Sequence, residues 1–120
     1  MYAIYSGDVL IGYSALEYGD PPMGVAFGAF EPTPQFSQLG AQAVLAADGA
    51  GRPVPDIRFW QGLSAKTPTG EELGSQAIVV TEYGPAGSPL GLEVSCLGIP
   101  YPLYDNLFPE HVEAYRNAFC

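Results

Sequence analysis

The sequence predicts an α+β fold: a mainly antiparallel sheet of about six strands, a C-terminal helix and a short helix near residues 34–45. Three observations carry this prediction. Short apolar runs with strand-forming residues recur along the chain, Gly and Pro separate them singly, and helical spacing is confined to two places. With 120 residues and 48% hydrophobic composition, the chain predicts a single domain over residues 1–120.

The first elements predict a hairpin followed by a third strand. Strands over residues 2–6 and 9–16 flank Gly7, which suits the positive φ of a two-residue turn. Alternation in the second strand puts one set of side chains on a common face: Val9, Ile11, Tyr13 and Ala15. The prolines of residues 17–22 predict a loop. Residues 23–30 predict the third strand, with small residues on one face for close approach by a helix or a bend.

The middle of the chain predicts the short helix and a loop. Glu31-Pro32 ends the third strand, and Thr33 caps a helix that has Pro34 in its first turn. Helical spacing then relates three apolar residues: Phe36, Leu39 and Ala43. Residues 46–55 are rich in turn formers and predict a mobile surface loop.

The second half predicts another set of antiparallel strands. Strands over residues 57–66 and 75–83 flank a turn that begins at Thr67, and residues 84–89 predict a further turn. Residues 91–97 predict a half-buried strand, because three apolar side chains alternate with polar ones: Leu92, Val94 and Cys96.

The C-terminal part predicts extended chain and then a helix. Each proline within residues 98–104 biases its predecessor away from helix. Pro109 begins the helix, with Glu110 near its start and Arg116 near its end, as the helix dipole favours. Its buried stripe is predicted to contain Val112, Tyr115 and Phe119.

Acidic residues outnumber basic ones throughout the chain. Thirteen acids and four bases give a net charge of −9, divided almost evenly between the two halves. This charge disfavours binding to nucleic acids and to anionic membranes, both of which require Lys and Arg. It attracts a basic protein partner, although the alternative that it only maintains solubility stays open.

The cysteines and the N-terminus point to a reducing compartment. Cys96 lies in an apolar run and predicts a buried, unreactive thiol; Cys120 ends the chain, and a disulfide between them stays an open alternative. The first ten residues lack the basic and apolar regions of a signal peptide, and no apolar run approaches the ~20 residues of a membrane span. A cytoplasmic location is expected.

The sequence contains no set of residues with the spacing that a catalytic or metal-binding site requires. Glu110, His111 and Glu113 resemble a metal-ligand set in composition, but successive helical residues point about 100° apart. A single histidine without a Gly-x-Ser-x-Gly turn disfavours a serine hydrolase, and Cys96 faces inward by alternation. Gly24-x-x-x-Gly28 lacks the Lys that follows a phosphate loop. No catalytic, metal or cofactor site is predicted, and an enzymatic role is left open but disfavoured.

The candidate binding residues are aromatic or polar side chains near element ends. Tyr and Trp anchor binding surfaces when they are exposed, but they are also core material in small domains. The candidates for a binding surface are Asp20, Trp60, Tyr101, Tyr104 and His111. Most of them lie in or beside the Pro-flanked segments 17–24 and 98–109.

Two segments carry a resemblance to small uncharacterised bacterial proteins. The first is GDPPMGVAFG at residues 19–28, continuing to Phe30 and Pro32, and the second is LGIPYPLY at residues 97–104, followed by Leu-Phe-Pro. The resemblance implies a bacterial, free-standing cytoplasmic protein. It implies no activity, cofactor or site residue.

Two functional hypotheses follow. The first is a non-enzymatic acidic protein that binds a basic protein partner, in the manner of an immunity or inhibitor protein. The second is a small-molecule-binding domain or enzyme with a pocket between sheet and helix, where Asp20, Glu31 or His111 converges with a tyrosine.

Overall fold

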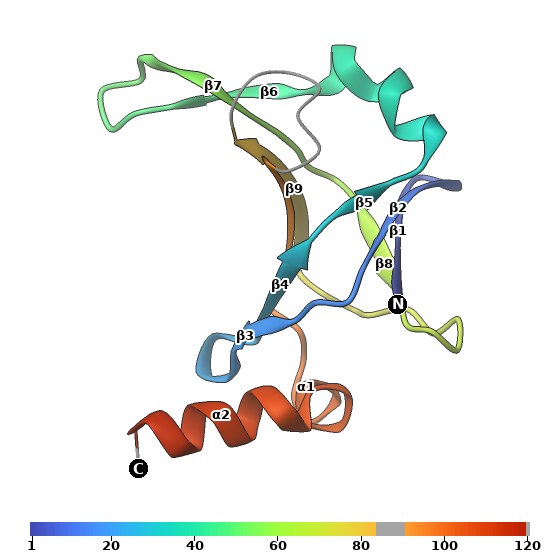
Figure 1. The fold of residues 1–120 in the computed structure, drawn as a ribbon, viewed down its shortest axis with the longest axis vertical. Coiled ribbons are helices and arrows are strands. Elements are labelled where there is room, and N and C mark those ends of the chain that lie inside the picture. Colours follow the sequence, from blue (N-terminus) through green and yellow to red (C-terminus); the bar gives the residue numbers. More distant parts are fainter. Residues whose placement is uncertain (84–90, 120) are drawn as a thin grey trace.

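The fold is α+β, as predicted, and consists of two antiparallel sheets with the two C-terminal helices at one end. A computed structural model describes residues 1–83 and 91–119. The predicted turn at residues 84–89 and the C-terminal Cys120 lie outside the described residues. Figure 1 shows the two sheets facing each other, with the C-terminal helices at the lower end of the long axis and one hairpin at the upper end.

The smaller sheet contains the predicted N-terminal hairpin. Its strand order is β5-β2-β1-β8, formed by Glu31–Pro32, Val9–Ser14, Tyr2–Ser6 and Ser64–Lys66. Gly7 has φ +60 in the hairpin turn, as predicted. The predicted face of the second strand is wrong: Tyr13 is exposed, whereas Ile11 and Ser14 are fully buried. The cause is a register shift opposite Ile4 and Tyr5, which changes the side on which alternate residues point.

The larger sheet has six strands in the order β3-β4-β10-β9-β7-β6. Their bounds are Tyr18–Asp20, Val25–Ala29, Leu92–Leu97, Ala77–Tyr83, Pro53–Trp60 and Val44–Ala47. Leu92, Val94 and Cys96 point into the core, as their alternation predicted. The opposite side of this sheet, here called the outer face, carries these described residues: Tyr18, Asp20, Val25, Phe27, Ala29, Val44, Ile57, Phe59, Ala77, Val79, Thr81, Tyr83, Glu93, Ser95 and Leu97.

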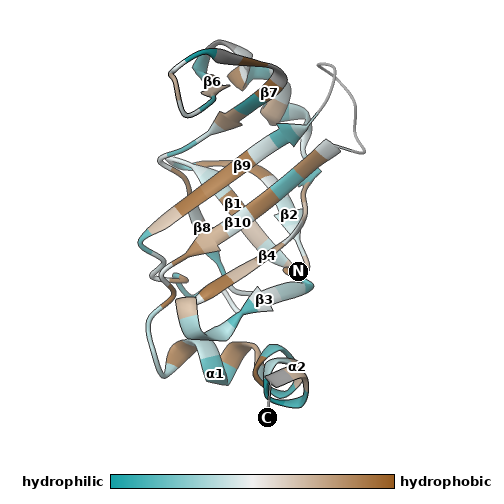
Figure 2. Ribbon diagram, turned by 90° about the vertical axis from the view of Figure 1, so that its left-hand side faces the viewer, coloured by the Kyte–Doolittle hydropathy of each residue, from teal (hydrophilic) through white to brown (hydrophobic). Residues whose placement is uncertain are grey.

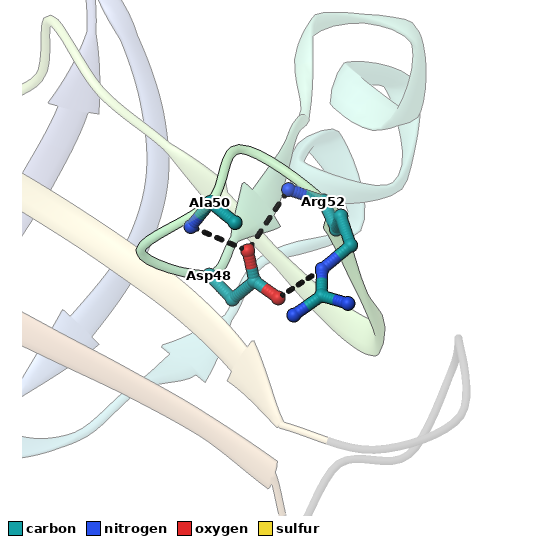
Figure 3. Close-up of polar contacts among 3 residues, drawn as sticks. All are labelled: Asp48, Ala50 and Arg52. Carbon is teal, nitrogen blue, oxygen red and sulfur yellow. Dashed lines mark hydrogen bonds and ion pairs between the residues drawn. The ribbon is translucent and has the colours of Figure 1, made fainter.

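Several segments expected to be loops form strands instead. Part of the predicted loop 17–22 is the short strand β3, which pairs with β4. Residues 46–55 contribute to the β6–β7 hairpin rather than to a free loop. Figure 3 shows why its turn is ordered: the Asp48 carboxylate accepts hydrogen bonds from the amides of Ala50 and Arg52 and from the Arg52 guanidinium. These bonds hold the pKa of Asp48 below its usual value.

The predicted strand 57–66 is two strands in different sheets. The chain leaves β7 at Trp60, turns at Gly62 with φ +72, and enters the smaller sheet as β8. The predicted end at Glu31-Pro32 is likewise a crossing, because these residues form β5 and pair with β2. The chain thus passes from one sheet to the other between Trp60 and Ser64 and between Ala29 and Glu31.

Both predicted helices are present, but the first differs from the prediction in helix type and the second in the exposure of its predicted buried stripe. The first, η2 (Pro34–Gln42), is a 3-10 helix; Thr33 precedes it, but its hydroxyl donates to Leu10 O instead of capping it. Chain predicted to be extended after Gly98 becomes helical in α1 (Leu103–Leu107). The C-terminal helix α2 (Pro109–Phe119) begins at the predicted proline. Its predicted stripe is only partly correct, because Tyr115 is 38% exposed and the side chain of Phe119 is not described.

The core lies between the two sheets. Phe30, Phe36 and Trp60 form an edge-on aromatic group, with 5.1 and 4.7 Å between successive ring centroids. Glu82 is buried on the inner side of the larger sheet and pairs with Arg58 at 2.8 Å, so this buried carboxylate has a partner. Among the described residues, no helix is long and apolar enough to cross a membrane.

Candidate functional site

The first component of the candidate site is the turn between β3 and β4. Asp20 ends β3, and the prolines that follow begin the 3-10 helix η1 (Pro21–Met23). Gly24 closes the turn with φ +64, and its amide donates to Pro21 O at 3.0 Å. A Cβ on Gly24 would lie 2.8 Å from Ile99 O, and Gly24 O accepts from the Ile99 amide at 2.9 Å. The turn is therefore held directly against the second Pro-rich segment.

The second component is the segment that leads from β10 into α1. Gly98 turns the chain with φ +68, and the bond between Tyr101 and Pro102 is cis. The first turn of α1 aims Tyr104 back at the sheet, where its hydroxyl donates to Val25 O at 2.7 Å. Burial raises the pKa of Tyr104 to about 12, and the negative charges of Asp20 and Asp105 add to this rise. Both carboxylates therefore act on the same hydroxyl group.

His111 connects α2 to the start of β3. Its Nε2 lies 2.8 Å from Leu16 O; because a carbonyl oxygen only accepts, this nitrogen carries a proton. The imidazole stacks on Phe108 with 5.1 Å between centroids and 9° between planes. Gly19 lies so close that a Cβ there would collide with the Tyr104 hydroxyl and the His111 ring. Figure 1 shows α2 running beneath β3, as these contacts require.

A groove opens where the two Pro-rich segments meet, and it is here called the tyrosine groove. Its volume is about 370 Å³. Met23 and Tyr101 on its lining are 68% and 81% exposed, so large apolar groups meet solvent at its edges. It is lined by Pro21, Pro22, Met23, Gly24, Gly74, Gln76, Gly98, Ile99, Pro100, Tyr101, Tyr104 and Asp105.

A second groove, here called the helix groove, lies between α2 and the chain that leaves β2. Its volume is about 510 Å³. Tyr2 stacks on Phe108 at 5.4 Å, and Phe108 stacks on His111, so three rings lie in series along it. Burial raises the pKa of Tyr2, and the charge of Glu110 contributes. The groove is lined by Tyr2, Ala15, Leu16, Glu17, Leu107, Phe108, Glu110, His111 and Ala114.

The charges near these grooves are mostly negative. Exposed carboxylates stand in both linings, with Asp105 in the tyrosine groove and Glu17 and Glu110 in the helix groove. Arg52 and Arg58 belong to the β6–β7 hairpin, at the opposite end of the long axis in Figure 1, and both are paired with carboxylates. We call the end formed by β3, η1, α1 and α2 the acidic end.

The structure brings most of the sequence-predicted site residues together. Asp20, Tyr101 and His111 all belong to the acidic end, and Asp20 and Tyr101 are exposed. Tyr104 belongs there too, but it is 2% exposed, so its ring supports the tyrosine groove from within and offers little surface to a partner. Glu31 lies apart in β5 of the smaller sheet, so it does not converge with these groups.

Trp60, one of the candidates for a binding surface, packs in the core, which is the alternative that the sequence left open. It is 2% exposed, and its indole N–H donates to Leu39 O at 2.8 Å. The ring packs on Phe36, and the Arg58 guanidinium lies 4.9 Å from its centroid. Both the indole N–H group and the ring of Trp60 therefore make their contacts inside the fold.

The residues that sequence reasoning missed are those without a motif. Met23 and Asp105 lie inside the Pro-flanked segments 17–24 and 98–109 but were not among the named candidates, and their only signal was the neighbouring prolines. Tyr2 and Glu17 reach the helix groove from the other end of the chain, which no local pattern reveals.

Among the described residues, no group of three or more His, Cys, Asp or Glu side chains is arranged to hold a metal ion. No protein-family model, curated protein or solved structure matches this chain.

Proposed function

We propose that this protein binds a basic protein partner at its acidic end. The observation that carries the proposal is the tyrosine groove, where exposed Tyr101 and Met23 stand beside Asp105, with Asp20 close enough to act on Tyr104. Exposed aromatic and methionine side chains are enriched at protein interfaces, and carboxylates beside them select Lys and Arg on the partner.

The rigidity of the groove supports this proposal. Backbone hydrogen bonds join its two sides at Gly24 and Ile99, and the Tyr104 hydroxyl fixes α1 to β4. A preformed surface loses less conformational entropy when it binds, so more of the contact energy appears as affinity. A basic side chain can lie over the Tyr101 ring and reach a carboxylate from there.

A binding titration tests the proposal with a labelled octa-arginine peptide as the probe. The double variant D20N/D105N should weaken binding roughly tenfold, because it removes two charges from the groove edge. The matched control D8N/E31Q removes two exposed charges from the smaller sheet and its hairpin turn, and should change the affinity less than about twofold. Equal weakening by both variants would mean that the peptide senses net charge and not this site.

A second candidate function is binding of a small aromatic amine in the helix groove. Its volume lies within the range of small-molecule sites, about 300–1,000 Å³, and it combines three stacked rings with Glu17 and Glu110. Phenethylamine is a suitable probe: saturation-transfer NMR should detect its ring in wild type, and E110Q should reduce the signal. A signal unchanged by E110Q would reject this candidate.

A further inference from the structure

Within residues 1–83 and 91–119, no helix or strand covers the outer face of the larger sheet. In Figure 2 the viewer looks onto this face, and no helix or strand lies in front of β4, β10 and β9. The side chains there are unusually apolar for a solvent-facing antiparallel sheet, which is commonly polar on its wet side. Phe27, Phe59 and Val79 are half-buried there, and the Tyr18 ring on the neighbouring strand β3 stacks on Phe27 with 5.5 Å between centroids.

The charge pattern of this face differs from that of the whole chain. The net charge is −9, yet among the outer-face residues defined above the carboxylates are two: Glu93 on the inner strand β10 and Asp20 on the edge strand β3. Glu93 stands in register with Thr81 on β9, and Thr81 in turn with Phe59 on β7. This face offers few carboxylates for ion pairs with a basic partner. The surface that complements it is therefore apolar and uncharged.

We propose that the outer face joins two copies of this chain in a face-to-face dimer. A second copy supplies the same neutral, apolar surface, and a two-fold axis makes such a contact self-complementary. Six strands about 4.8 Å apart, with about five residues of about 3.4 Å each, cover roughly 500 Å². Two such faces bury on the order of 1,000 Å², the lower limit of a specific interface. The dimer is therefore weak, and it dissociates at micromolar concentrations.

Salt distinguishes this dimer from the proposed binding of a basic partner. Two chains of charge −9 repel each other, and added salt screens this repulsion. The dimer fraction should rise when NaCl is increased from about 20 to about 500 mM, whereas binding of a basic peptide should weaken. Because the two salt dependences have opposite signs, an experiment that rejects one proposal can be told apart from an experiment that rejects the other.

Sedimentation equilibrium on the full chain tests the inference through three variants. V79K sets a charge in the middle of the outer face and should raise the dimer Kd at least tenfold. V9K makes the same change at an exposed position of β2 and should leave the Kd unchanged. E93Q removes one desolvated charge per copy and should lower the Kd roughly fivefold.

Two results would overturn the inference. One is a wild-type chain that stays monomeric at about 1 mM in high salt, above the micromolar range expected for a weak interface. The other is a V79K variant that dimerises as wild type does while retaining the wild-type near-UV circular dichroism. If V79K does not fold, T81K replaces it, because this substitution on the same face removes less apolar surface. T81K should then raise the dimer Kd, and wild-type dimerisation by a folded T81K would overturn the inference.

Discussion

Tyr104 is the side chain that joins the two Pro-rich segments. Its ring is buried against Phe108 at 5.1 Å, and its hydroxyl donates to Val25 O, 79 positions earlier in the sequence. The exposed Tyr101, three residues away, has the same chemistry but a different setting, with 81% of its surface accessible. The first tyrosine builds the tyrosine groove, and the second is available to a ligand.

Substituting Tyr104→Phe should destabilise the fold by about 1–2 kcal/mol, because the ring is kept while Val25 O loses its buried donor. Tyr101→Phe is the matched control and should change the free energy of unfolding by less than about 0.5 kcal/mol. Urea unfolding of both variants measures the difference. Equal effects would show that the hydrogen bond of Tyr104 adds nothing to stability.

Stability should fall as the pH rises above about 9, because folding keeps Cys96 and Tyr104 protonated. Burial raises the pKa of Cys96 from 9.0 to about 12, and that of Tyr104 from 10.0 to about 12. Between those limits the folded chain binds more protons than the unfolded chain, so the free energy of unfolding decreases with pH.

The Cys96→Ala variant isolates the thiol contribution to this pH dependence. Wild type should lose about 1–2 kcal/mol more than the variant between pH 8 and pH 10.5, because Cys96 is fully buried and only its unfolded form ionises there. Urea midpoints at the two pH values provide the measurement. Parallel losses in both proteins would assign the pH dependence to other groups.

At the scale of elements, the acidic end depends on close packing of β3 against α1 and α2. Gly19 supplies this packing, since a side chain there would collide with Tyr104 and His111. Leu16 contributes from the other side: its backbone adopts φ 49, and its carbonyl accepts the His111 hydrogen bond. The left-handed conformation costs about 1–3 kcal/mol, which burial of Leu16 and this hydrogen bond help to offset.

Gly19→Ala should destabilise the protein by about 1–3 kcal/mol, because the added methyl group must push the helices away from β3. Gly40→Ala is the control: a Cβ there meets nothing within 4 Å, so stability should change by no more than about 0.5 kcal/mol. Thermal unfolding compares the two. A Gly19 variant as stable as the control would show that the helices shift without cost.

Local patterns predicted the elements whose side chains alternate clearly and whose ends carry strong signals. The strand at residues 92–97 and the helix at Pro109 are of this kind, since apolar alternation and an N-terminal proline each act within a few residues. The β6–β7 hairpin was missed because residues 46–55 are rich in turn formers; its turn is ordered by hydrogen bonds from the Ala50 and Arg52 amides to the Asp48 carboxylate. The division of residues 57–66 between two sheets depends on a single turn at Gly62.

The candidate site shows the same limit. The two Pro-flanked segments could be singled out from sequence, but their contact rests on hydrogen bonds between residues far apart, such as Tyr104 with Val25. The sequence left Trp60 open between core and surface, because an aromatic side chain near a strand end carries no local sign of burial. Tertiary packing decides which tyrosines and tryptophans remain exposed.

At the scale of the whole molecule, the charged groups are distributed unequally along the long axis. Paired Arg52 and Arg58 lie in the upper hairpin of Figure 1, while the carboxylates of the acidic end, which also contains Arg116 of α2, flank two grooves at the lower end. The uncovered outer face lies between these ends and is nearly free of charge. The molecule therefore offers one surface to cations and another to apolar groups.

An NMR titration of the labelled protein with octa-arginine peptide, in about 20 mM NaCl, tests the central claim most directly. Binding at the acidic end predicts that the largest amide shifts occur in the tyrosine groove, at Gly24, Gly98, Tyr101 and Asp105. The amides of the β1–β2 hairpin should shift least. Shifts of equal size at every acidic surface, or a maximum at the Glu71–Glu72 turn, would contradict the proposed site.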